Sequence, residues 1–302
     1  MKKENAEEII DYVVTEAKER FSNWKYESYS NLDKIFIPRG YEQGGFAASI
    51  FFGLLEKKKI ATVNCLGSIL ESYTGEKKYS RNEKGSLESS FYYDMKNGLY
   101  NVYGKKFYRC VDEFLNKSLG NPGGWFWVKL WQMLICCRHL KEDYRSSFKF
   151  YLKKKYCEFK NIPNISDRDF CNIDSDDWER FKKEAPPWEE LYGIGENVFD
   201  FIVGDIKEFK FNEDSFKLDA ANMHFLNVTG ISKLLRIQSR DSIIGFLKEL
   251  NLKHQYSVRE INTGIYTYCS ETERENYGFC RDRKKCEECG VNEICEKNFR
   301  SF

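Results

Sequence analysis

A closely spaced set of four cysteines near the C-terminus constrains this chain more than any other feature. The set has the spacing C-x5-C-x2-C-x5-C within GFCRDRKKCEECGVNEICEKNF, and its members are Cys280, Cys286, Cys289 and Cys295. Two thiolates separated by two residues can bind one metal centre, and the two outer thiolates can complete the coordination from either side. The spacing therefore predicts a loop that is organised by a bound metal or metal cluster.

The distribution of the other cysteines favours a metal site over disulfides. Five of the 11 cysteines lie between Cys269 and the C-terminus, and the other six are scattered, as small buried apolar side chains usually are. The chain opens with MKKENAEE and no apolar signal segment, so we expect an intracellular location, cytoplasmic or associated with the nucleoid. Zinc and an iron-sulfur cluster both suit four thiolates, and the spacing alone leaves both open.

Composition sets the class of protein. The 302 residues are 41% hydrophobic and 16% aromatic, which is enough for a substantial core in one large or two modest domains. Mean hydropathy is -0.63 and no stretch approaches the roughly 20 apolar residues of a transmembrane helix, so we expect a soluble protein with no membrane partner. The net charge of +1 is below that expected of a domain built wholly for nucleic acid, although basic runs occur at 57–59, at 153–155 and in the cysteine loop.

Helical periodicity dominates the chain, and five prolines interrupt it rarely. Helices are predicted over 5–21, 46–58, 60–72, the apolar segment WFWVKLWQMLICCRHL and 142–158. The segment NPGG at 121–124 reads as a turn. The aromatic-rich stretch 79–108 fits either strands or an irregular excursion and stays unassigned. The predicted fold class is all-α.

A second informative segment is WEELYGIGENVFDFIVGDI, which follows two consecutive prolines. A short helix ending at Leu191, a glycine turn from Gly193 to Gly195 and a second helix from about Glu196 would form a helix-hairpin-helix. Glycines permit the tight reversal, and the amides of the turn and of the following helix N-terminus can hold a backbone phosphate. A plain connection between two helices is the more common role of such a turn.

The order of these features resembles that of the endonuclease III-like DNA glycosylases. The resemblance covers about residues 186–298: the helix-hairpin-helix with L-x-G-I-G, then Asp219 at the start of the helical run LDAANMHFLNVTGI, then the cysteine loop. The family's usual loop spacing is C-x6-C-x2-C-x5-C around a 4Fe-4S cluster, which is one residue longer in the first gap than here. The segment GIYTYC also resembles the sequence before the family's first ligand, so Cys269 rivals Cys280, and the smaller departure in spacing favours Cys280.

The resemblance implies roles for individual residues. Gly193 and Gly195 fall on the hairpin glycines that face a DNA phosphate, and Asp219 falls on the catalytic aspartate. A carboxylate there can stabilise the cationic sugar or activate water when an N-glycosidic bond breaks, although an aspartate in such a place can merely cap a helix. Asn197 stands where bifunctional members carry a lysine nucleophile, so cleavage through a Schiff base should be absent. Nothing in the pattern places Lys217 as its substitute.

Basic residues supply further candidate DNA contacts. The run LICCRHLKEDYR could match the family helix beside the flipped-out nucleotide, which would place Arg138 or His139 at the DNA. A histidine between apolar neighbours is more often half-buried and structural. The cysteine loop could grip phosphates through its basic side chains, Arg283, Lys284 and Lys285. Residues 22–120 have no counterpart that we identify in the family, and base specificity could be encoded there.

Together these features predict a monomeric, all-α enzyme of three parts: an N-terminal elaboration at 1–120, a helical glycosylase-like core at 121–268 and a 4Fe-4S cluster loop at 269–302. The expected activity is hydrolysis of the N-glycosidic bond of a damaged, modified or mismatched nucleotide in double-stranded DNA, without lyase activity. Two alternatives stay open: a non-catalytic DNA-binding protein with the same hairpin and cluster, and a zinc-knuckle protein-interaction factor.

Overall fold

A computed structural model describes residues 1–20, 26–41, 46–70, 104–117, 123–235, 237–269, 278, 280 and 283–299. These residues form helices joined by turns and loops, and strand pairing among them is confined to an isolated bridge between Glu27 and Ile206. The all-α prediction is therefore confirmed. No helix in these ranges is both long and apolar enough to cross a membrane. The chain divides into two compact units, Met1–Tyr26 with Phe209–Phe302, and Glu27–Glu208.

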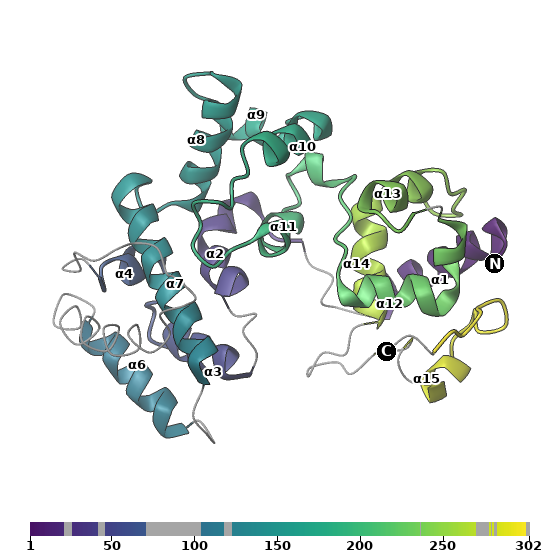
Figure 1. The fold of residues 1–302 in the computed structure, drawn as a ribbon, viewed down its shortest axis with the longest axis horizontal. Helices are drawn as coiled ribbons and strands as arrows, with labels where there is room; N and C mark the ends of the chain where they lie inside the picture. Colours follow the sequence, from purple (N-terminus) through teal and green to yellow (C-terminus); the bar gives the residue numbers. More distant parts are fainter. Residues whose placement is uncertain are drawn as a thin grey trace. The chain divides into compact units, whose positions relative to one another are not determined.

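The first unit joins the two ends of the chain. Helix α1 (Lys3–Arg20) packs against α14 (Val258–Cys269), and α14 also packs against α12 (Ala220–Thr229) and α13 (Arg240–Lys248) (Figure 1). The remaining elements are the 3-10 helices η4 (Lys210–Asn212) and η5 (Ile231–Leu234) and the short helix α15 (Arg283–Glu287). The apolar face predicted for the first helix is buried in this core through Ile9, Ile10, Val13 and Val14.

The second unit is a separate set of helices. They are η1 (Tyr29–Asn31), α2 (Leu32–Tyr41), α3 (Phe46–Lys57), α4 (Val63–Gly67), α6 (Gly104–Lys117), α7 (Gly123–Asp143), α8 (Phe148–Lys160), α9 (Asp167–Cys171), α10 (Ser175–Glu184) and α11 (Glu196–Gly204). Helix α7 is the apolar helix expected behind the NPGG turn, and it packs against α4 and α2. Aromatic pairs fill the core, with the rings of Phe36 and Phe148 stacked at 4.3 Å between centroids.

Two helices begin or end at residues other than those predicted from the sequence. Within the described part of the helix expected over 60–72, which ends at residue 70, the helical residues are those of α4. Thr62 caps this helix by accepting a hydrogen bond from the Cys65 amide at 3.2 Å. The charged helix expected over 142–158 begins only at Phe148, because the backbone reverses at Arg145 and Ser146, whose φ angles are 57° and 58°. The Ser147 side chain then caps α8.

The expected domain boundaries after 120 and 268 do not coincide with the two units. Helix α1 belongs with the C-terminal part of the chain because its apolar face packs on α14, and position 268 falls within α14 itself. Most of the unassigned stretch 79–108 lies outside the described residues, and α6 begins at Gly104. Residues 121–122 of the NPGG segment also lie outside them, while Gly123 already begins α7.

Candidate functional site

The four cysteines of the predicted loop line one small cavity in the first unit. The cavity has a volume of about 20 Å³, and Cys280, Cys286, Cys289 and Cys295 all contribute to its wall. The remainder of the wall comes from α1, α12, α14 and the loop, and it consists of Ile9, Val13, Phe225, Val228, Thr229, Tyr268, Val291 and Asn292. The structure thus brings together thiols that are up to 15 residues apart, in a mainly apolar environment.

The chemistry of this donor set fits a group that is bound by thiolates alone. All 11 cysteines are free thiols. Burial raises the pKa of Cys295 to about 11 and also raises the pKa of Cys286 above its usual value, so a metal would have to displace these protons. Within the described ranges, no three His, Cys, Asp or Glu side chains are already gathered closely enough to hold a single metal ion. Four thiols suit either zinc or an iron-sulfur cluster.

Cys269 and Cys280, the two rivals for the first ligand position, are neighbours. Cys269 is the last residue of α14, it is 0% exposed, and its side chain forms a hydrogen bond with that of Cys280. Cys280 contributes to the cavity wall, whereas Cys269 does not. Of the two, Cys280 is therefore the one that faces the cavity, and Cys269 is a buried thiol beside it.

Helix α12 holds both ends of the cysteine loop. The backbone amides of Glu296 and Asn298 donate to the carbonyls of Thr229 and Val228 at 3.2 Å and 2.9 Å. At the other end, Nε2 of His224 lies 2.9 Å from the carbonyl oxygen of Cys280. The loop is therefore attached to the same helix that carries part of the cavity wall.

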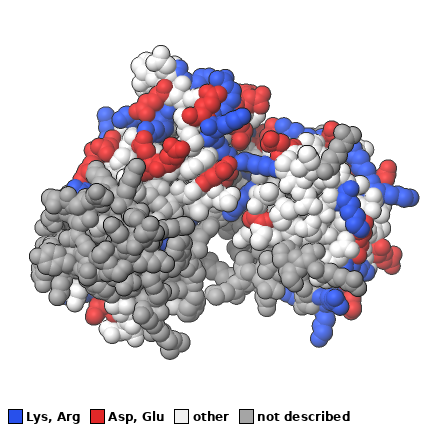
Figure 2. Space-filling view, viewed as in Figure 1, with Lys and Arg blue, Asp and Glu red and all other residues white. Residues whose placement is uncertain are grey.

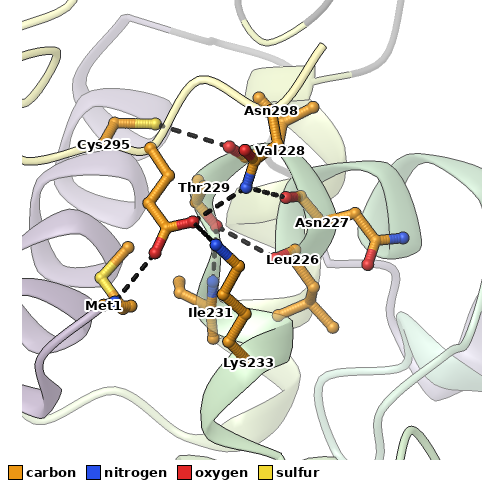
Figure 3. Close-up of polar contacts among 10 residues, drawn as sticks. Met1, Leu226, Asn227, Val228, Thr229, Ile231, Lys233, Cys295 and Asn298 are labelled. Atoms are coloured by element: carbon orange, nitrogen blue, oxygen red, sulfur yellow. Dashed lines mark hydrogen bonds and ion pairs between the residues drawn. The ribbon is translucent and has the colours of Figure 1, made fainter. Parts of the chain in front are cut away.

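Glu296, which the sequence analysis did not identify, anchors the segment that follows Cys295. Its carboxylate contacts the Met1 α-ammonium at 2.8 Å, the Asn298 side-chain amide at 2.9 Å and the Lys233 ammonium, which comes from η5 (Figure 3). The hydrogen bond from Lys233, with those from Met1 and Asn298, lowers the pKa of Glu296 to about 2. A charged side chain beside a cysteine was the available signal, but its partners are distant in sequence.

We expect Glu296→Gln to weaken the first unit at neutral pH by more than at acidic pH. The pKa of Glu296 is lower in the folded state, so its stabilising contribution is present above the unfolded pKa of roughly 4.3 and is lost as the pH falls toward about 2. Thermal melts of both proteins between pH 7 and pH 3 should converge as the pH falls. Glu293→Gln, at an exposed position in the same loop, is the matched control and should change little. A constant difference across this range would contradict the proposed role of the charge.

Asp219 lies at the N-terminus of α12. Its Oδ1 accepts a hydrogen bond from the Asn222 amide at 2.9 Å, which makes Asp219 the N-cap, while Oδ2 has no hydrogen-bond partner among the described residues. The carbonyl of Lys217 accepts hydrogen bonds from the Asn222 and Asn262 side chains at 3.3 Å and 3.1 Å. These bonds hold the backbone two residues before Asp219. Asp219 therefore has the capping role considered from the sequence, and this role uses Oδ1 but not Oδ2.

The glycine turn lies in the second unit, and its first flanking helix is not formed. Residues 187–190 form turns in place of the helix expected to end at Leu191, whereas the second helix, α11, begins at Glu196 as predicted. Two prolines remove backbone donors here, and the remaining backbone bonds are those of short turns, from the Glu189 amide to the Pro186 carbonyl and from the Leu191 amide to the Trp188 carbonyl. Side chains from α8 add further contacts. Tyr151 donates to the Pro187 carbonyl, and Lys155 contacts the Glu190 carboxylate at 2.5 Å.

The two glycines of the turn have different requirements. Gly193 has φ +80, and a Cβ there would lie 2.5 Å from Oε1 of Gln132, so both backbone and space demand glycine. Gly195 is the N-cap of α11 with an ordinary φ of -104, and a Cβ there would meet nothing within 4 Å. The turn is held from within, since Lys129 donates to the Gly193 carbonyl at 2.8 Å. Gly195 is exposed and leaves the outer side of the turn open to a ligand.

The other residues singled out from the sequence lie on separate helices, α7, α11 and α15. The Arg138 side chain donates to Glu142 at 2.7 Å, and His139 contacts Asp143 at 2.9 Å, as expected of a structural histidine. Asn197 is exposed in the first turn of α11. The three basic residues of the loop lie on α15, where Arg283 and Lys284 are exposed, Lys285 is half-buried, and the Arg283 guanidinium lies 5.4 Å from the ring centre of Phe299.

Basic side chains of the second unit are interleaved with acidic ones. Within the run 153–155, Lys153 pairs with Asp167 at 2.6 Å and Lys155 pairs with Glu190. On the face shown in Figure 2, blue and red side chains alternate over the upper part, where Figure 1 places α8 to α10. Two of the three lysines of this run are therefore paired with carboxylates, and Lys154 lies over the ring of Tyr144 at 4.9 Å from its centroid.

Comparisons with known proteins do not extend this description. No protein-family model matches the chain, and no curated protein or solved structure is significantly similar to it.

Proposed function

We propose that the protein is a monofunctional DNA glycosylase that binds a 4Fe-4S cluster. The observation that carries the proposal is that one helix, α12, begins at the candidate catalytic carboxylate, Asp219, and forms part of the wall of the cavity lined by four cysteines. A cluster bound by these cysteines would organise the loop and hold it against α12. The cysteine loop, α12 and Asp219 all belong to the first unit, and the glycine turn to the second.

In this reaction the bond between the sugar C1′ and the base nitrogen breaks, and positive charge develops on the sugar. Oδ2 of Asp219 is available to stabilise that charge or to accept a proton from the attacking water. The water oxygen bonds to C1′, and the base leaves with the bonding electron pair and takes up a proton. Oδ1, which accepts the Asn222 amide, holds the carboxylate in orientation throughout.

The absence of an amine at position 197 makes the proposed enzyme monofunctional. An amide cannot form a Schiff base with the sugar, so the expected product is a free base and an intact strand with an abasic site. Lys217 is two residues before Asp219, and its carbonyl is held by Asn222 and Asn262. It is the first amine to test if strand cleavage does occur.

The test is a set of duplexes that each contain one modified or mismatched nucleotide. Free base is measured by mass spectrometry, abasic sites are measured by alkali cleavage of the strand, and borohydride is added to trap any covalent intermediate. We expect base release from at least one duplex, no strand cleavage before alkali and no trapped adduct. A trapped adduct would overturn the monofunctional mechanism, and intact base in every duplex would count against catalysis.

The geometry of the turn leads to a separate expectation for DNA binding. Gly195→Leu should weaken binding to duplex DNA about tenfold at fixed salt, because hydrogen bonds to charged groups contribute about 1.5–3 kcal/mol and a bulky side chain would keep a phosphate away from the turn. The loss should be the same for unrelated duplex sequences, since phosphate contacts carry no sequence information. Fluorescence anisotropy with two such duplexes measures it.

Gly204→Leu is the matched control for this variant. Gly204 ends the same helix, α11, and a Cβ there also meets nothing within 4 Å, so the change adds equal bulk at the opposite end. Both variants should fold as the parent does. Equal affinities for Gly195→Leu and the parent would reduce the turn to a connector and remove the phosphate site.

A non-catalytic DNA-binding protein is the second candidate function. The observation that favours it is that Asp219 already has a structural task as the cap of α12. It differs from the first candidate in one outcome: duplex binding that depends on Gly195, with no base released from any duplex.

A further inference from the structure

One donor side chain reaches a sulfur in the cysteine-lined cavity. The hydroxyl of Tyr268 donates a hydrogen bond to Sγ of Cys289 at 3.2 Å. Tyr268 is 1% exposed and lies in the last turn of α14, so its hydroxyl is directed into the cavity from the core side of the unit. The bond therefore forms away from solvent, where hydrogen bonds are electrostatically stronger.

A second tyrosine, Tyr12, contacts both Tyr268 and the backbone next to Cys289. The ring of Tyr12, on α1, packs edge-on against Tyr268 with 6.4 Å between centroids. Its hydroxyl accepts a hydrogen bond from the Gly290 amide at 3.0 Å, one residue after Cys289. The two helices α1 and α14 thus hold both the donor and the turn that presents the sulfur.

The other polar side chains of the cavity wall use their donors elsewhere. The Thr229 hydroxyl donates to the Phe225 carbonyl at 2.7 Å, and the Asn292 amide donates to the Glu287 carbonyl at 2.9 Å. Among the described residues that line the cavity, Tyr268 is the one whose side-chain oxygen donates to a cysteine sulfur. Tyr268 is therefore the wall residue whose hydroxyl acts directly on a cysteine sulfur.

We propose that Tyr268 is a positioning residue that sets the reduction potential of the group bound by the cysteines, through its hydrogen bond to the Cys289 sulfur. The inference rests on the proposed iron-sulfur cofactor. Hydrogen bonds to ligand sulfurs are among the factors that determine cluster potentials, because a donor offsets negative charge and that charge is greater in the reduced form. Tyr268 therefore favours the reduced form and raises the potential, and it keeps its proton in both states.

Tyr268→Phe in the iron-loaded protein is the direct test. In a titration with redox mediators, each cluster takes one electron from the mediator, and absorbance measures the two forms. We expect the equilibrium constant for reduction to fall about tenfold, which for one electron is about 59 mV toward lower potential. Iron content should stay equal to that of the parent, because all four thiol ligands remain.

Tyr256→Phe is the control, since it removes a tyrosine hydroxyl of the same unit that contacts the Thr15 hydroxyl at 2.9 Å and, among the described residues, no cysteine, and its potential should match the parent's. Incorporation of 3-fluorotyrosine at position 268 tests the same bond without deleting it, and the more acidic hydroxyl should raise the potential. Iron-loaded Tyr268→Phe with an unchanged potential would overturn the inference and leave the proposed function standing. Protein that holds zinc and no iron would also overturn the inference, because zinc has no reduction potential for Tyr268 to change. Base release from the same preparation tests the proposed enzyme activity separately.

Discussion

Asp219→Asn should reduce the rate of base release by about a hundredfold or more, because a neutral amide cannot offset the positive charge that develops on the sugar. The variant should keep its fold, since asparagine is as good an N-cap as aspartate and can still accept the hydrogen bond from the Asn222 amide. Duplex binding should change little. Single-turnover base release, with anisotropy for binding, measures the two effects separately.

A helix cap in the other unit provides the control for this substitution. Asp174 caps α10 by accepting a hydrogen bond from the Asp176 amide at 2.8 Å, so Asp174→Asn makes the same chemical change at the same kind of position. It should leave base release unaltered. Unchanged base release in Asp219→Asn would end the catalytic assignment and leave Asp219 as a cap.

Cys286→Ser should remove most of the bound iron and loosen the segment that follows. Three thiols and a hydroxyl hold an iron-sulfur cluster poorly, and residues 283–299 contribute little buried apolar surface of their own apart from Val291. Iron and sulfide analysis, the visible absorption spectrum and hydrogen exchange over 283–299 report the loss. Hydrogen exchange in the second unit should be unaffected.

Cys269→Ser is the control that the structure provides for the ligand assignment. Cys269 is buried beside Cys280 without lining the cavity, so its replacement should leave the iron in place. Loss of iron in this variant would make Cys269 the ligand in place of Cys280. Full iron in Cys286→Ser would contradict the cysteine site, and zinc without iron in the parent would keep the site but change the metal.

Local patterns predicted the elements that depend on neighbouring residues. The spacing of Ile9, Ile10, Val13 and Val14 places them on one face of a helix whatever they pack against, and α1 buries that face. The aspartate at 219 was recognisable as a cap for the same reason, since it bonds to an amide three residues away. The prediction of a helix before Gly193 was wrong: the segment forms short turns, with the Leu191 amide bonded to the Trp188 carbonyl, and Tyr151, which is distant in sequence, donates to the Pro187 carbonyl.

The sequence by itself determined the helical class and the close spacing of Cys286, Cys289 and Cys295, because helix periodicity and a short loop are set by residues near one another. Only the tertiary structure decided that Cys280 lines the cavity with them while Cys269 lies behind it. The apolar wall from α1, the anchor at Glu296 and the donor at Tyr268 also follow from tertiary packing. Hydrophobic burial is non-directional, so an apolar face specifies that it will be covered but not which distant segment will cover it.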